Sequence, residues 1–91
     1  MKYEDMRAAL QVMGLKERPT LREIKTRHRE LVKRHHPDVG NENDNEAIRK
    51  INDAYVVVLA YVTGYRFSFT ENEFLDQNPD ERLRRQFMNS P

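Results

Sequence analysis

No cysteine occurs among the 91 residues, and this absence excludes disulfides, thiolate zinc sites and thiol catalysis. Long apolar runs are also missing, because the longest one, Val56 to Val62, has about a third of the length of a bilayer-spanning helix. The first residues, Met1 to Asp5, contain no apolar core of the kind found in signal peptides. We therefore expect a soluble, cytoplasmic protein with no membrane contact.

The formal net charge is only +1, but the charges are unevenly distributed along the chain. Residues 20–36 carry two acidic side chains, Glu23 and Glu30, against six basic ones, namely Arg22, Lys25, Arg27, Arg29, Lys33 and Arg34. A concentration of positive charge on one segment predicts an acidic partner surface. With 91 residues and 37% hydrophobic composition, the chain suffices for one small core if its helices are amphipathic.

Apolar side chains recur at helical spacing in three segments. The first helix is expected over 4–13 and ends at Gly14, a residue suited to a left-handed stop. The second begins after a capping box of Thr20 and Glu23. Its apolar face is formed by Leu21, Ile24, His28, Leu31, Val32 and His35. The third is capped by Asn43 or Asp44 and runs to about Val62, because its apolar stripe continues through Val56, Val57 and Val58 and a strand there would have no partner.

The chain beyond Gly64 is polar apart from a recurring set of large apolar side chains. These are Phe67, Phe69, Phe74, Leu75, Leu83 and Phe87. Cap signals at Thr70 with Glu73, and at Asn78-Pro79, predict two short helices over 71–76 and 79–88. The third helix is apolar beyond one face, so we expect residues 65–91 to fold back and cover it. The predicted fold is all-α, with one domain over 1–64 and an extension over 65–91 that packs on the third helix.

His36-Pro37-Asp38 lies between the basic helix and the third helix. Proline fixes its own φ and disfavours the α region for His36, so the helix that begins at 21 must end here. The tripeptide then presents an imidazole and a carboxylate on a stiff turn. Together with Met13-Gly14-Leu15, the segment 20–35 and the segment 48–55, it resembles the J domain, the co-chaperone module that stimulates ATP hydrolysis by DnaK-type chaperones. The resemblance covers about residues 3–62.

The resemblance implies a fold in which the first helix packs across an antiparallel pair formed by the second and third. It also implies a co-chaperone that binds a DnaK-type ATPase and stimulates its ATP hydrolysis, without being an enzyme itself. Carried over by position, docking involves Lys25, Arg29 and Arg34, with Arg49 assisting, and the signal is delivered by His36, Pro37 and Asp38. Residues 65–91 are then a place for a client or assembly partner, either in a minimal co-chaperone or in a fragment of a longer chain.

Four residues depart from the family's commonest pattern. Glu30 stands where many members have a basic residue, Lys33 where an apolar one is usual, and Val39-Gly40 where Arg or Lys followed by Asn is frequent. These differences leave room for a specialised partner ATPase. A degenerate J-like scaffold is a further alternative, but the intact His-Pro-Asp argues against it.

Nucleic-acid binding, metal binding and catalysis are the other functions that these residues could indicate. A small basic nucleic-acid-binding or assembly module could also use the cationic helix. However, Leu21 and Glu23 occupy the helix start, where base-contacting residues are usual, and an acid-rich loop follows. No metal or cofactor is expected, because His28 and His35 lie about two helical turns apart. No nucleophile or phosphate-binding glycine loop accompanies His36 and Asp38, which argues against catalysis.

Overall fold

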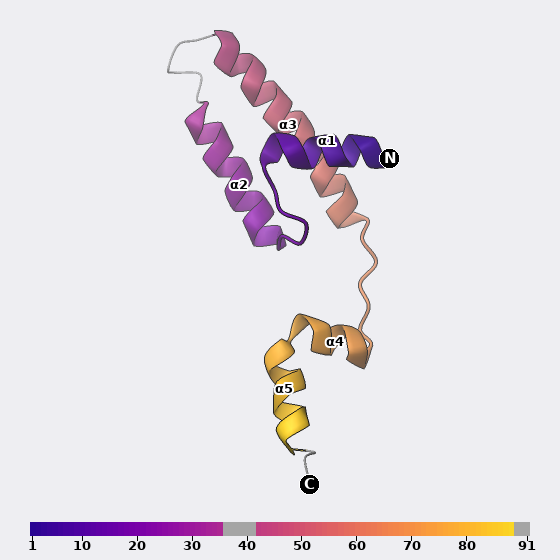
Figure 1. The fold of residues 1–91 in the computed structure, drawn as a ribbon. Helices are drawn as coiled ribbons and strands as arrows, with labels where there is room; N and C mark the ends of the chain where they lie inside the picture. The colour runs from indigo at the N-terminus through magenta and orange to yellow at the C-terminus, as the bar shows by residue number, and fades with distance from the viewer. Residues whose placement is uncertain (36–41, 89–91) are drawn as a thin grey trace.

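The computed structural model describes residues 1–35 and 42–88, without the side chains of 42–44. Five helices and no strand are present in these ranges: α1 (Tyr3–Met13), α2 (Leu21–Arg34), α3 (Glu42–Thr63), α4 (Glu71–Gln77) and α5 (Pro79–Met88). Figure 1 shows α2 beside α3, with α1 crossing α3, and the C-terminal helices set apart. The predicted all-α fold with a helical extension is confirmed. No helix in the described part is long and apolar enough to cross a membrane.

Local sequence signals account for most helix ends. Gly14 adopts φ 63° at the end of α1, in the left-handed region that favours glycine. At the start of α2, the Thr20 hydroxyl accepts a hydrogen bond from the Glu23 amide at 3.1 Å, and the Glu23 carboxylate accepts one from the Thr20 amide at 3.2 Å. These reciprocal bonds satisfy two amides that a helix start leaves unpaired. The predicted capping box is therefore present.

The start of α3 differs from the prediction by two to three residues, because a cap at Asn43 or Asp44 places the first helical residue at 44 or 45. Asn43 and Asp44 lie inside the helix, which begins at Glu42, so neither is its N-cap. The continuous apolar stripe of the segment prevails over the local strand preference of Val56 to Val58, and these residues are helical. Pro79 opens α5, a position where its missing amide costs no hydrogen bond.

Side chains from α1, α2 and α3 form one small core. Its buried members are Ala9, Met13, Ile24, Leu31, Ile51, Ala54 and Val58. Leu21 is expected on the apolar face of α2 but is exposed, because it is the first residue of the helix. The core thus holds α1 across the α2–α3 pair, as in the predicted J-domain arrangement.

The two C-terminal helices are joined by ion pairs rather than by a core, because neither contains a buried residue. Arg82 of α5 donates to Asp76 of α4 at 2.6 Å, and Arg85 donates to Glu71. Within α5, Arg84 makes a bidentate contact with Glu81 at 2.7 and 2.9 Å. The hydrogen bonds from Arg84 hold the pKa of Glu81 below its usual value. Exposed pairs of this kind contribute little stability individually.

The extension does not cover α3 in this structure, which differs from the expected packing. Among the described residues, α4 and α5 contact each other and no other helix. The Cα radius of gyration is 18.4 Å, whereas a compact chain of this length has about 12 Å. The segment after Gly64 leads away from the end of α3, so Val56 and Tyr61 remain exposed. The extended residues 65–69 thus place α4 and α5 away from α3.

Removing residues 65–91 is expected to leave the thermal midpoint of the α1–α3 unit almost unchanged, because every buried residue in the described ranges lies before the cut. This is also the test of the proposed boundary between 64 and 65. The measurement is a melt of the shortened and full-length chains followed by circular dichroism at matched concentration. A drop of many degrees in the shortened chain would show that the extension does cover α3 in solution.

Candidate partner-binding surface

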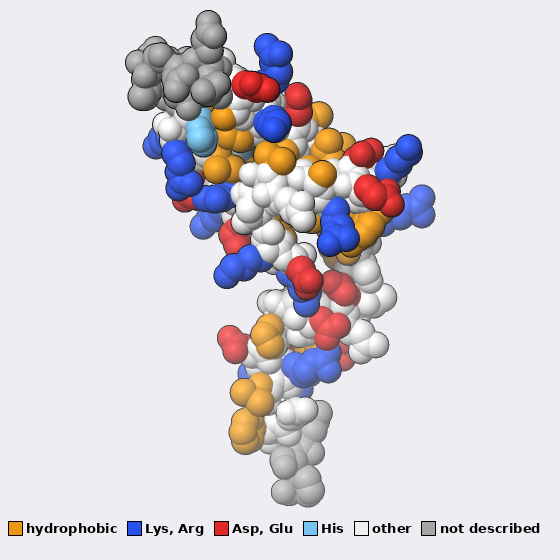
Figure 2. All heavy atoms as spheres, turned by 45° about the horizontal axis from the view of Figure 1, so that its top comes forward, with side chains coloured by type: hydrophobic (Ala, Val, Ile, Leu, Met, Phe, Trp, Pro, Cys, Tyr) orange, Lys and Arg blue, Asp and Glu red, His pale blue; other side chains and the backbone are white. Residues whose placement is uncertain are grey.

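The basic face of α2 is defined here by the exposed side chains Lys25, Arg29 and Arg34. Figure 2 shows Lys and Arg side chains gathered along the edge of the molecule where α2 lies. The amphipathic sequence of α2 explains this placement, because Ile24 and Leu31 turn inward and bury against α1 and α3. The charged side chains therefore face outward, on a helix whose rotation about its axis is set by its buried residues.

Within the described part of the chain, none of these three cations forms an ion pair. The guanidinium of Arg29 donates to the Thr26 hydroxyl of the same helix at 3.3 Å. Arg22, Lys25 and Arg29 line a shallow surface hollow together with the exposed Leu21. The basic face thus offers uncompensated positive charge around a small apolar spot, an arrangement suited to an acidic protein surface.

Arg27 lies in the same basic segment as these cations, but its side chain makes a structural contact between α1 and α2. Its Nε donates to the backbone carbonyl of Met13 at 2.8 Å, in a partly buried position. That carbonyl is among the last four of α1, which have no partner within the helix. A Cβ added at Gly14 would lie 3.1 Å from the Arg27 guanidinium, a tight contact that the arginine side chain would have to relieve by a small shift. Arg27 joins α1 to α2 and is not part of the exposed basic face.

Arg27 also forms an ion pair with Glu30. The Arg27 guanidinium lies 3.5 Å from the Glu30 carboxylate, one helical turn away. The pair is partly exposed, so solvent screens it and its contribution to stability is small. Glu30 nevertheless adds one negative charge at the border of the basic face, where the sequence comparison with J domains leads one to expect a cation.

His28 is held between α2 and α3 by two contacts. Its Nε2 lies 2.8 Å from Oδ1 of Asn52, and its ring stacks on Tyr55 with centroids 3.8 Å apart and an interplanar angle of 4°. His28 is therefore a partly buried packing residue whose Nε2 has a hydrogen-bond partner, in keeping with its place on the predicted apolar face of α2. Asn52 and Tyr55 lie 24 and 27 positions after His28 in the sequence. Helical periodicity within α2 therefore could not identify Asn52 as the partner of His28.

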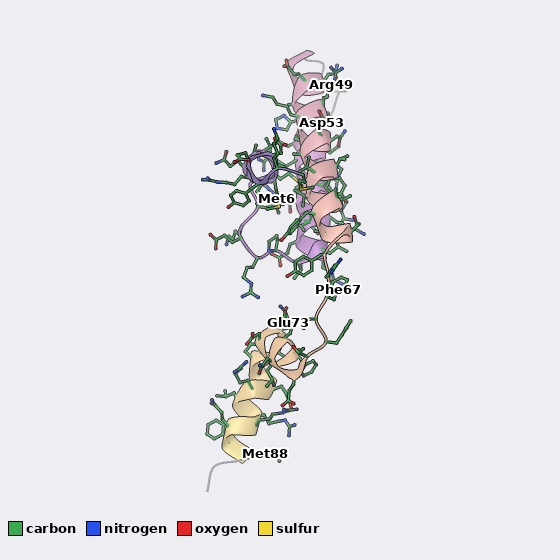
Figure 3. The ribbon with its side chains drawn as sticks, turned by 90° about the vertical axis from the view of Figure 1, so that its right-hand side faces the viewer. Met6, Arg49, Asp53, Phe67, Glu73 and Met88 are labelled. Atoms are coloured by element: carbon green, nitrogen blue, oxygen red, sulfur yellow. The ribbon has the colours of Figure 1, made fainter. Side chains whose placement is uncertain are left out.

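Arg49 lies on the N-terminal half of α3, on the other helix of the pair. Its side chain is exposed, and with Asn45, Glu46, Lys50 and Asp53 it lines a second shallow hollow. Figure 3 shows Arg49 and Asp53 near the same end of α3. Arg49 therefore shares its surroundings with acidic neighbours, unlike the cations of the basic face.

Comparison with known proteins shows which family these helices represent. The model of the DnaJ domain matches residues 9–60, more than half of the chain. The chain belongs to the DnaJ domain family. Within this DnaJ domain the match begins in α1 and ends in α3, so it spans all three helices of the core. The family resemblance carried by the His-Pro-Asp tripeptide and its flanking segments is therefore confirmed.

One curated relative is the chaperone protein DnaJ of Hydrogenobacter thermophilus (strain DSM 6534 / IAM 12695 / TK-6), which is 39% identical over 49 residues. The aligned part is 53% of this chain but 14% of the relative. The chain thus spans a small fraction of the length of the curated relative that it matches. No solved structure matches the chain.

The DnaJ domain brings together only part of the predicted site within the described residues. Lys25 and Arg29 lie one turn apart on the exposed surface of α2, Arg34 is exposed in its last turn at a different angle around the helix, and Arg49 lies on α3. His36, Pro37 and Asp38 lie outside the described residues. Sequence reasoning missed the structural role of Arg27, although its spacing from Ile24 and Leu31 places it on the same side of the helix as the core residues.

Proposed function

We propose that this chain is a co-chaperone that binds a DnaK-type chaperone ATPase and stimulates its ATP hydrolysis. The observation that carries the proposal is the match to the DnaJ domain over the three core helices. The exposed basic face of α2 supports it, because this face leads directly to the His36-Pro37-Asp38 tripeptide. In this proposal the chain is not itself an enzyme, and hydrolysis takes place on the partner.

The basic face would orient the partner. Cations on a rigid helix attract an acidic surface over several ångströms, increase the rate of encounter and select one orientation. Lys25, Arg29 and Arg34 would make this contact, and Arg49 would add to it from α3. Because the contact is electrostatic and exposed, screening by salt weakens it, with a Debye length of about 8 Å at physiological ionic strength.

The tripeptide would deliver the signal. Pro37 limits the backbone to few conformations, so His36 and Asp38 would meet the partner with little loss of conformational entropy. A carboxylate at 38 can accept a charge-assisted hydrogen bond from a cationic side chain of the partner. Stimulation requires that these contacts be stronger in the hydrolysing state of the partner than in its resting state, because only a difference in affinity shifts a conformational equilibrium.

The direct test is single-turnover ATP hydrolysis by a candidate DnaK-type ATPase with and without this protein. We expect the rate to rise with the concentration of the chain and to saturate when the partner is fully bound. The control is the same chain with its α1–α3 core unfolded by a buried substitution. A rate that stays at the basal value with every candidate ATPase would refute the proposed function.

Charge reversal on α2 should weaken partner binding with little effect on folding. Changing Lys25 and Arg29 to Glu is expected to raise the Kd about tenfold, since each exposed ion pair contributes roughly 0.2–1 kcal/mol and repulsion replaces attraction. The measurement is a binding titration at low and at raised salt. Wild-type affinity should fall as salt rises, and the difference between wild type and variant should shrink.

A matched control separates local charge from net charge. Arg7 is exposed on α1, away from the basic face, and it forms no ion pair among the described residues. Arg7→Glu combined with Lys2→Glu changes the net charge as much as the α2 variant does. If both double variants weaken binding equally, the partner senses the overall charge of the chain and not the basic face of α2.

A further inference from the structure

Residues 65–69 form an extended connection between α3 and α4, and they alternate aromatic and polar side chains. Tyr65, Phe67 and Phe69 occupy the odd positions, with Arg66 and Ser68 between them. In an extended chain, side chains two residues apart lie on the same side, so the three aromatic rings share one side of this segment. The exposed fractions are 74% for Phe67 and 95% for Phe69. Exposure of this extent is unusual for phenylalanine.

The backbone of this segment lacks hydrogen-bond partners in the described part of the chain. The amide of Tyr65 donates to the Val62 carbonyl at 3.2 Å, but the amides of residues 66–69 and the carbonyls of residues 65–69 make no such bond there. A row of unpaired amides and carbonyls on an extended chain is a template for pairing with another strand. The segment therefore resembles a β-strand without its neighbour.

Aromatic contacts tie the segment to the end of α3. The rings of Tyr61 and Tyr65 meet edge to face with centroids 5.9 Å apart, and those of Tyr65 and Phe67 do so at 6.1 Å. Figure 3 shows Phe67 on the connection between the two groups of helices. These contacts orient the aromatic side of the segment relative to the folded core, so part of the entropic cost of ordering a strand is already met.

We propose that residues 65–69 of two copies of this chain pair as antiparallel strands, with the two-fold axis passing at Phe67. An antiparallel strand is complementary to a copy of itself, and a two-fold dimer uses the same surface on both chains. Pairing would satisfy the open amides and carbonyls of both segments and bring their aromatic sides together. The proposal goes beyond the co-chaperone function and does not involve α2.

The charge and the aromatic pattern select this register. With Phe67 opposite Phe67, Tyr65 lies opposite Phe69 in both directions, so all three aromatic residues form cross-strand pairs, which stabilise sheets. The same register places Arg66 opposite Ser68. Shifting the axis to Arg66 would place two guanidinium groups opposite each other, and like charges in that position are destabilising. Shifting it to Ser68 would leave Tyr65 opposite Glu71.

The test uses the absence of cysteine from the natural chain. Phe67→Cys places two thiols opposite each other across the two-fold axis, where Cα separations of about 4.5–5.5 Å suit a disulfide. Phe69→Cys is the matched control: it removes the same aromatic side chain from a more exposed position of the same segment. Its two copies would lie about 13 Å apart at four residues of separation, too far for a disulfide.

Under mild oxidation at equal concentration, Phe67→Cys is expected to form covalent dimer several-fold faster than Phe69→Cys. Equal rates, or faster cross-linking at 69, would overturn the proposed pairing. Sedimentation equilibrium of the wild-type chain gives an independent measurement that needs no cysteine. The average mass should rise towards that of two chains as concentration increases, and the paired change Phe67→Ser with Phe69→Ser should abolish the rise. A wild-type chain that stays monomeric at every concentration would also overturn the proposal.

Discussion

Asp38→Asn is expected to abolish most of the stimulation of the partner's ATP hydrolysis while the protein remains folded. The substitution keeps the size of the side chain but removes its negative charge, and with it the charge-assisted hydrogen bond proposed at this position. Such bonds contribute about 1.5–3 kcal/mol, which corresponds to a loss of roughly ten- to a hundredfold in the stimulated rate. The measurement is single-turnover hydrolysis by the DnaK-type ATPase at saturating co-chaperone.

The folded state should not change, because the buried residues in the described part of the chain belong to α1, α2 and α3 and form a core of their own. Circular dichroism and the thermal midpoint of the variant provide that check. Asp53→Asn is the matched control, since Asp53 is an exposed aspartate on α3 and the chemical change is identical. His36→Gln should behave like Asp38→Asn. Full stimulation by Asp38→Asn would mean that the tripeptide is not the active element.

Met13→Ala is expected to lower the free energy of unfolding by about 2–5 kcal/mol, the range for truncating a fully buried methionine. Met13 is 0% exposed and is the largest completely buried side chain among the described residues. It lies at the end of α1, and its backbone carbonyl accepts the hydrogen bond from Arg27. The cavity left by alanine would therefore loosen the contact by which α1 crosses the α2–α3 pair. Small domains have few kcal/mol to lose, so much of the population should unfold.

Met88→Ala provides the same chemical change at an exposed position, because Met88 on α5 is 70% exposed. Its effect on unfolding should lie within about 0.5 kcal/mol, as is usual for surface substitutions. Both variants would be compared by urea denaturation followed at the helical circular-dichroism signal. Similar midpoints for the two variants would show that the buried cluster around Met13 does not dominate the stability of the chain.

The helices of this chain could be located from sequence because their determinants are local. Gly14 ends α1 through its own backbone freedom, and Thr20 with Glu23 begins α2 through bonds between residues three positions apart. Periodicity also identified Ile24 and Leu31 as core residues. The same reasoning failed at Leu21. Its spacing places it on the apolar face, but it is the first residue of the helix and its side chain is exposed.

The candidate site was predictable to a similar extent. The exposed positions of Lys25, Arg29 and Arg34 follow from a helix whose opposite side is apolar. Arg27 could not be separated from them by charge or composition, since its partner is a backbone carbonyl fourteen residues away. The role of His36, Pro37 and Asp38 stays a prediction that the Asp38→Asn experiment tests.

The sequence by itself determined the helical class, most of the helix ends, the family and the asymmetry of charge, because each depends on residues within a few turns of one another. Only the tertiary structure decided which cation joins α1 to α2, which residue pairs with His28, and where residues 65–88 lie. The apolar composition of α3 predicted that residues 65–91 would cover it, but composition does not specify the direction in which the chain leaves the helix. Whether an apolar side chain finds a partner within the same chain depends on the path of the connection, and the extended residues 65–69 lead away from the core.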